Sequence, residues 1–299
     1  MTRQLVLIHG RDQQNKDAAE LKQTWIKSLR EGLAKSGLEL PIGEDDIRFP
    51  YYGDTLDQLN QELPPGEVAK VIIKGEGSDD QKAMFVRSVV LEIQQAMGIT
   101  DDQVLEQVDA AERTVIEKGV RNWGWVQKVL ETLDKHVPGA SGAIMARATA
   151  DAYRYLHNPG IRATINIGVA KAFTPGVETV VVGHSLGSAV AYWLLKNEGH
   201  ENGWKVPLFL TVGSPLGVRV FREAVAPRKH PRCVGKWFNA MDSRDVVSLY
   251  PLDERNFSVD PPIENKTDVD NFTENRHGIV GYLSDAEVAK RIHDALVAE

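Results

Sequence analysis

Short apolar runs alternate with amphipathic stretches toward both ends of the chain. Runs rich in β-branched residues, bounded by polar residues, predict buried strands. These runs lie at 4–8, 47–52, 68–74, 180–182, 207–212 and 236–240. Apolar residues three and four positions apart predict helices at 17–36, from 188 onward, at 218–225 and at 285–298. Strands that alternate with helices indicate an α/β protein with a mostly parallel sheet covered on both faces.

The boundaries of two of these helices have recognisable signals. Gly37 follows the first predicted helix and is expected to end it. Ser284 precedes the last helix, and Glu287 stands three residues later. This spacing predicts a capping box with Ser284 as N-cap.

Residues 79–173 have a different pattern, because almost all of this middle segment is predicted to be helical. Its apolar residues recur at helical spacing: Val104, Leu105, Val108, Val115, Ile116, Trp123, Val126, Val129, Leu130 and Leu133. We expect residues 79–173 to form a helical cap, or lid, inserted into a core made of residues 1–78 and 174–299. The alternative is that these helices are ordinary crossover helices that pack on the sheet.

The composition excludes several classes of protein. The 299-residue chain is 42% hydrophobic and 26% charged, with a net charge of -7 and no basic run, which argues against a nucleic-acid partner. The single Cys233 excludes an internal disulfide and a cysteine zinc site. The opening MTRQLVLIHG predicts a strand and not a signal peptide, and no apolar run reaches the ~18 residues that a transmembrane helix needs. We therefore expect a cytoplasmic protein, and read the Asn-x-Ser/Thr sequons at Asn256, Asn265 and Asn271 as chance matches in a polar loop.

The segment VVVGHSLGSAVAYWLL at 180–195 carries the strongest chemical signal. It places a G-x-S-x-G motif, Gly183 to Gly187, between a predicted strand and a predicted helix. This context is typical of a nucleophile elbow, in which a strained tight turn exposes Ser185. The positive end of the following helix faces the serine, and the N–H of Leu186 is placed to bind an oxyanion.

A second oxyanion donor is expected from the loop after the first strand, in LVLIHGRDQ. Gly10 allows the backbone to turn inward, so that the N–H of Arg11 or of Gly10 faces Ser185. His9 is expected to have a structural role.

A nucleophilic serine needs a base and an acid that orients the base, and in this sheet order both follow the serine. His277 is favoured because it lies in a loop before the last helix, next to Gly278. Three other histidines are less well placed, at the end of the elbow helix, at the wrong end of a strand and inside the last helix: His200, His230 and His293.

Two carboxylates are candidates for the acid, because Asp242 and Asp245 both follow the strand at 236–240. Asp242 could instead stabilise its own turn. Asp245 is preferred, because Val246 and Val247 would pack inward and hold its carboxylate outward.

Together the segments LIHG, GHSLGS, VGSPLG, WFNAMDSRDVV and HGIVGYL resemble a bacterial α/β-hydrolase of the serine esterase or lipase type. The nearest group is similar to class 3 lipases and to GPI inositol-deacylase-like proteins. The resemblance covers about the first 75 residues and the chain from about Thr179 onward. It implies an α/β-hydrolase fold, a triad of Ser185, Asp245 and His277, and no metal or organic cofactor. Val246 stands where the group usually has proline, so Asp242 stays the alternative to Asp245.

The expected reaction is hydrolysis of a carboxylic ester, with lipid ester, thioester and amide as further possibilities. His184, Ser214 and Trp123 are expected to lie in the substrate site, and Trp123 and Val126 to face acyl chains from the lid. A dinucleotide site at Gly75-Glu76-Gly77 is disfavoured, because a third glycine is missing and Asp79 and Asp80 would repel phosphate. The alternative to a serine hydrolase is a non-catalytic binding or scaffold module built on a hydrolase fold.

Overall fold

The computed structural model describes residues 3–10, 17–53, 80–108, 123–136 and 142–298. Within these residues, six parallel strands form one sheet in the order β2-β1-β3-β4-β5-β6. They are β1 (Gln4–Ile8), β2 (Ile47–Arg48), β3 (Thr179–His184), β4 (Val206–Val212), β5 (Val234–Ala240) and β6 (Glu264–Lys266). The predicted α/β class with a parallel sheet is therefore confirmed. Because the strands are parallel, their carboxyl ends share one edge, where such sheets collect functional groups.

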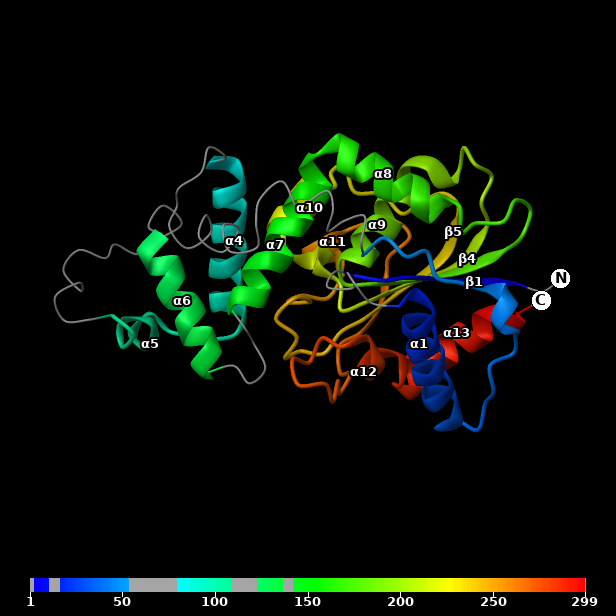
Figure 1. The fold of residues 1–299 in the computed structure, drawn as a ribbon, viewed down its shortest axis with the longest axis horizontal. Coiled ribbons are helices and arrows are strands. Elements are labelled where there is room, and N and C mark those ends of the chain that lie inside the picture. Colours follow the sequence, from blue (N-terminus) through cyan, green and yellow to red (C-terminus); the bar gives the residue numbers. More distant parts are fainter. Residues whose placement is uncertain (1–2, 11–16, 54–79, 109–122, 137–141, 299) are drawn as a thin grey trace.

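Alternation along the strands produces a hydrophobic core on each face of the sheet. Leu7 pairs in register with Val182, which pairs with Leu210, and all three pack on one face. That face is covered by α1 (Ala18–Ala34), α12 (Ile279–Leu283) and α13 (Ala286–Val297) (Figure 1). Val181 and Phe209, which precede Val182 and Leu210 in the sequence, point to the opposite face, because successive side chains of a strand alternate.

The opposite face is covered by α8 (Pro159–Ala170), α9 (Leu186–Leu194) and α10 (Arg219–Ala224), as Figure 1 shows. The helices α4 (Asp80–Ala96), α5 (Asp101–Leu105) and α6 (Trp123–His136) lie at one end of the molecule, and α7 (Gly142–His157) leads from them back toward the sheet. Buried residues of these helices and of the sheet form one continuous cluster. A separate unit over residues 79–173 thus stays a prediction.

Several predicted elements differ from the structure in their bounds. The strand expected at 47–52 is limited to Ile47–Arg48, and Tyr52 instead packs its ring on His9. The strand expected at 68–74 and the Gly75-Glu76-Gly77 motif lie outside the described residues. The sequence pattern did not indicate β6, a three-residue edge strand of polar residues, or the five-residue α12.

The prediction of Ser284 as N-cap of the last helix was wrong by one residue. Ser284 has helical backbone angles, φ -82° and ψ -3°, because it ends α12. Asp285 is extended, and its carboxylate accepts hydrogen bonds from the N–H groups of Glu287 and Val288. A cap needs an extended backbone, and two helices that almost touch leave only Asp285 in that conformation.

The sequons do not share one polar loop. Asn265 belongs to β6 and hydrogen-bonds both the N–H and the carbonyl of Leu252. Asn271 is completely buried, and Asn256 belongs to the short helix α11 (Glu254–Phe257). Asn265 is half-buried and Asn271 is buried, and both amides are hydrogen-bonded, so both have structural roles that a solvated polar loop would not provide.

Among the described residues, no helix combines the length and the apolar character that crossing a bilayer requires.

Candidate active site

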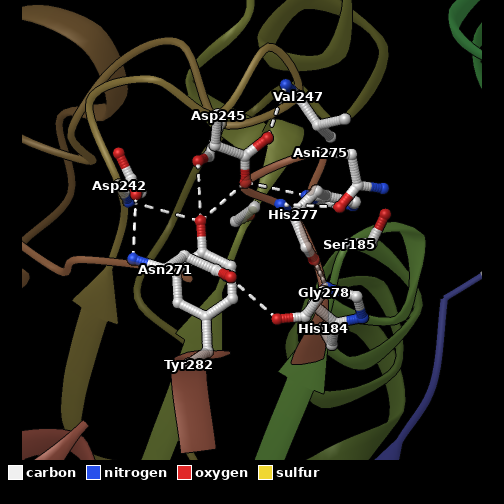
Figure 2. A network of polar contacts seen from close by, with 12 residues as sticks. His184, Ser185, Asp242, Asp245, Val247, Asn271, Asn275, His277, Gly278 and Tyr282 are labelled. Carbon is white, nitrogen blue, oxygen red and sulfur yellow. Dashed lines mark hydrogen bonds and ion pairs between the residues drawn. The ribbon is translucent and has the colours of Figure 1, made fainter. Parts of the chain in front are cut away.

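Ser185 connects β3 directly to α9 and has a strained backbone. Its φ is 55° and its ψ is -129°, a conformation that costs a non-glycine residue on the order of 1–3 kcal/mol. Its N–H donates to the carbonyl of Val212 in the neighbouring strand, at 3.1 Å. Ser185 is 8% exposed as a whole residue and lies at the carboxyl edge of the sheet (Figure 2). The structure thus places Ser185 in the tight turn that the sequence predicts.

Three glycines allow the backbone segments around Ser185 to touch. A β-carbon on Gly183 would lie 2.7 Å from Cα of Ser188, and one on Gly187 would lie 2.3 Å from the carbonyl oxygen of Ile8. A β-carbon on Gly10 would lie 2.8 Å from Cβ of Ser185. The loop after β1 therefore lies directly against the serine, as an oxyanion site formed by both segments requires.

The expected oxyanion donors are only partly described. The N–H of Leu186 is the first of α9, at the helix end where N–H groups have no partner within the helix. Gly10 lies against Ser185, whereas Arg11 lies outside the described residues. His9 is buried behind this loop, where its Nε2 accepts the N–H of Tyr52 and its Nδ1 donates to the Gly10 carbonyl. His9 thus fixes the path of the chain just before Gly10.

Substitution of Gly187 by alanine is expected to lower the melting temperature strongly, because its β-carbon would overlap the backbone of β1. Overpacking of this kind costs on the order of 1–3 kcal/mol or more. The matched control is Gly168→Ala on α8, where a β-carbon meets nothing within 4 Å. That variant is expected to be neutral or stabilised by up to about 1 kcal/mol. Thermal unfolding of both variants measures the difference, and equal melting temperatures would contradict the close approach.

A partly buried His277 and a completely buried Asp245 form a pair. The Nδ1 of His277 lies 2.7 Å from Oδ2 of Asp245, and the side chain of Asp245 has no exposed surface. With Nδ1 donating to the carboxylate, Nε2 of His277 has a free lone pair and can act as a base. In Figure 2, His277 lies between Asp245 and Ser185. The three residues predicted for a triad are thus brought to one place.

The carboxylate of Asp245 stays charged despite its burial. Burial raises its pKa, but His277, the hydroxyl of Tyr282 and the N–H of Val247 together hold the pKa below the ordinary value. Tyr282 donates to Oδ2 at 2.6 Å, and the N–H of Val247 donates to Oδ1 at 2.8 Å. Burial, and then the charge of Asp245, raise the pKa of Tyr282 well above its ordinary value, so its hydroxyl keeps the proton it donates.

Asp242 is also buried, but it has other partners. Its carboxylate accepts hydrogen bonds from the N–H groups of Arg244 and Asn271, and from the guanidinium of Arg244. Asn271 in turn donates to the carbonyl of Gly278, the residue after His277. Asp242 therefore holds the loop that carries His277, and the structure pairs the histidine itself with Asp245.

Gly278 fits closely in this loop. Its N–H donates to the hydroxyl of Thr273, and a β-carbon on Gly278 would lie 2.5 Å from Cγ2 of Thr273. The hydroxyl of Thr273 is also bonded to the amide oxygen of Asn271. Sequence reasoning did not assign a role to Asn271 or Tyr282. The only signal for Tyr282 was its place shortly after the His-Gly pair.

His184 lies against His277. Its Nε2 donates to the backbone carbonyl of His277 at 2.8 Å, and the two rings are 4.8 Å apart. Burial, followed by the neighbouring His277, lowers the pKa of His184 to about 3, so the ring is neutral at physiological pH. Its contacts support the backbone of His277, and it is not among the residues that line the pocket beside Ser185.

Ser214, expected in the substrate site, is also placed behind it. Its hydroxyl is 2.8 Å from that of Ser188 on α9 and accepts the N–H of Leu216. The next residue, Pro215, lines the pocket, whereas Ser214 does not.

A pocket opens beside Ser185 toward the helical middle of the chain. The enclosed space holds about 30 Å³, or about 420 Å³ when the open solvent at its mouth is included, and no charged side chain lines it. Its lining residues are Val89, Thr149, Ala152, Ser185, Leu186, Pro215, Val218, Phe221, Val246 and Val247. The wall opposite the sheet therefore comes from α4 and α7.

The residues expected to face acyl chains from the lid are not found in this wall. Val126 is completely buried within the hydrophobic cluster, since α6 packs on the far sides of α4 and α7. The side chain of Trp123 lies outside the described residues. Val126 has the helical spacing of a lid residue, but it packs between helices.

The described residues do not bring together three histidine, cysteine, aspartate or glutamate side chains that could hold a metal ion.

No family model, no curated protein and no solved structure matches this chain.

Proposed function

We propose that this protein is a serine hydrolase of the α/β-hydrolase type that cleaves esters of apolar carboxylic acids. The observation that carries the proposal is the pair of His277 with the buried Asp245, beside a strained serine at the carboxyl edge of a parallel sheet. A base oriented by a buried acid, next to a serine at the end of a helix, is the arrangement that acyl transfer needs. The β-α-β order of the chain and the segments that resemble serine esterases agree with it.

In the proposed reaction, Ser185 Oγ attacks the ester carbonyl carbon while His277 Nε2 takes its proton. The carbonyl oxygen becomes an oxyanion, which the N–H of Leu186 and the loop after β1 stabilise at the positive end of α9. His277 then gives the proton to the alcohol as the C–O bond breaks and an acyl-serine remains. Water attacks the acyl-serine with His277 again as base, which releases the carboxylic acid and restores Ser185.

The lining of the pocket supports an apolar acyl group. A charged acyl group would lose its hydration there without finding a partner, at a cost of several kcal/mol. An aliphatic chain would gain about 0.8 kcal/mol for each methylene it buries.

The proposal is tested by incubating the purified protein with a fluorophosphonate probe and mapping the labelled residue by mass spectrometry. An activated serine reacts, and we expect a single adduct on Ser185. The alternative, a non-catalytic module on the same fold, forecasts no labelling and no hydrolysis of p-nitrophenyl esters. Absence of both would refute the proposed function.

Ala152→Phe is expected to narrow the acyl pocket from the α7 side. Excluding two methylenes removes about 1.6 kcal/mol, so kcat/KM for hexanoate and octanoate esters should fall more than tenfold relative to acetate. A series of p-nitrophenyl esters measures this profile.

The matched comparison for Ala152→Phe is Val126→Ala in the buried interface between helices. Truncating a buried aliphatic side chain is expected to destabilise the fold by about 2 kcal/mol, without changing the chain-length profile. If Val126→Ala altered the profile and Ala152→Phe did not, the acyl group would bind elsewhere.

A further inference from the structure

We propose that Tyr282 is a positioning residue of the reaction, whose hydroxyl fixes the orientation and the charge distribution of the Asp245 carboxylate. The inference rests on the proposed hydrolase function and goes beyond its three reacting residues. Tyr282 lies near the end of α12 and is completely buried, and its hydroxyl points toward Asp245 (Figure 2).

The hydrogen bonds of Tyr282 have a fixed direction. The phenol has one proton, and the 2.6 Å contact to Oδ2 of Asp245 uses it, because a buried carboxylate can only accept. The N–H of Asp242 points at the same phenol oxygen from 3.2 Å and can only donate. The hydroxyl of Ser248 lies 3.4 Å away and is left as a weak donor to it. The tyrosine thus joins the backbone at Asp242 to the carboxylate at Asp245.

This arrangement leaves Asp245 one orientation. Oδ1 accepts from the N–H of Val247, and Oδ2 accepts from both Tyr282 and His277. The tyrosine and the histidine therefore share one oxygen. The hydroxyl disperses part of the negative charge that would otherwise act on the imidazole alone.

The hydroxyl could have been a structural group that only satisfies a buried polar site. Two features favour an effect on the reaction. It contacts the same oxygen atom as His277, and the rings of Tyr282 and His277 both lie against Gly213, where a β-carbon would come within 3.0 Å of the tyrosine and 3.1 Å of the histidine. Tyr282 and His277 thus share two neighbours, the carboxylate of Asp245 and Gly213, through which a change at Tyr282 affects His277.

The other titratable groups around the pair are few. His184 faces both rings from the end of β3 and is neutral. Asp242 lies on the other side of the phenol and is paired with Arg244. Neither group replaces the hydroxyl as a donor to Asp245, because the side chain of Asp242 is an acceptor and His184 donates to a backbone carbonyl.

The test is Tyr282→Phe, which keeps the ring and removes the hydroxyl. We expect kcat/KM to fall by about 10- to 100-fold, the size of effect that small misplacements of catalytic groups produce. The charge of Asp245 then acts on the imidazole alone and favours its protonated form. The acidic limb of the pH profile of kcat/KM should therefore move to higher pH.

The matched control is Tyr192→Phe, which removes another buried phenol hydroxyl, one bonded to the backbone of Lys229. It should leave both kcat/KM and the pH profile unchanged. If Tyr282→Phe behaves in the same way and only lowers the melting temperature, its role is merely structural and the inference is overturned.

A second variant covers the case in which Tyr282→Phe does not fold. Incorporation of 3-fluorotyrosine at position 282 keeps the ring and the hydroxyl but makes the hydroxyl a stronger donor. The acidic limb should then move to lower pH, and an unchanged limb would overturn the inference. If the wild-type protein neither reacts with the fluorophosphonate nor hydrolyses esters, the proposed function fails as well. An active wild type with an unaffected 282 variant refutes only the positioning role.

Discussion

Ser185→Ala is expected to abolish ester hydrolysis and fluorophosphonate labelling while the protein remains folded. Loss of the nucleophile of a triad typically reduces turnover by about 10⁴- to 10⁶-fold. The substitution removes one hydroxyl from a small side chain, and the backbone bond from Ser185 to Val212 is retained. Alanine keeps a β-carbon at the same positive φ, so the strain of the turn is about the same in both proteins.

The control for this experiment is Ser28→Ala on α1. Ser28 is also a buried serine, and its hydroxyl donates to the carbonyl of Thr24 within the same helix, on the face of the sheet away from the pocket. The Ser28 variant should be labelled and should hydrolyse esters like the wild type. Hydrolysis by the Ser185 variant at a rate near that of the wild type would show that another group is the nucleophile.

The sequence was informative wherever local pattern and structure share one cause. The strand predicted at 4–8 has the same bounds as β1, because a buried parallel strand is a continuous apolar run. Ser185 could be placed in a strained turn because two glycines bracket it where a strand and a helix meet. His277 and Asp245 could be chosen by chain order and strand ends, and the structure brings these two residues together.

The sequence was uninformative where a side chain has its role through tertiary contacts. The residues of β6 are polar, and only pairing with β5 makes them a strand. Val126 has the helical spacing of a lid residue, and its burial depends on which helices α6 meets. Tyr282 and Asp245 are 37 positions apart in the sequence, although the hydroxyl and the carboxylate form a hydrogen bond. A short-range sequence pattern cannot predict a contact between residues so far apart in the chain.

The same limit applies to the choice between the two carboxylates. Asp242 and Asp245 both follow β5, both are buried, and both accept backbone N–H groups. The two aspartates differ in their hydrogen-bond partners. The carboxylate of Asp242 bonds the backbone N–H of Asn271, whereas that of Asp245 bonds the ring of His277.

Asp245→Asn is accordingly expected to reduce kcat by about 10⁴-fold, the loss known for this substitution in a serine protease triad. The amide has only one acceptor oxygen, but Asp245 receives donors on both of its oxygens. If the amide oxygen faces Val247, its NH₂ group opposes the donors on His277 and Tyr282. His277 must then adopt the other tautomer, in which Nε2 carries the proton and cannot act as a base. If the amide is flipped, a buried N–H of Val247 loses its acceptor, and the imidazolium still lacks a negative partner.

Asp242→Asn is the matched variant, since it makes the same chemical change at a buried aspartate three residues away. It weakens the bonds to Arg244 and Asn271, so we expect a loss of stability of about 1–3 kcal/mol. Its kcat should fall far less than that of Asp245→Asn, because His277 keeps its carboxylate. Turnover at saturating ester and the melting temperature of both variants separate the two roles. A large loss of kcat in the Asp242 variant at an unchanged melting temperature, with Asp245→Asn still active, would make Asp242 the acid of the triad.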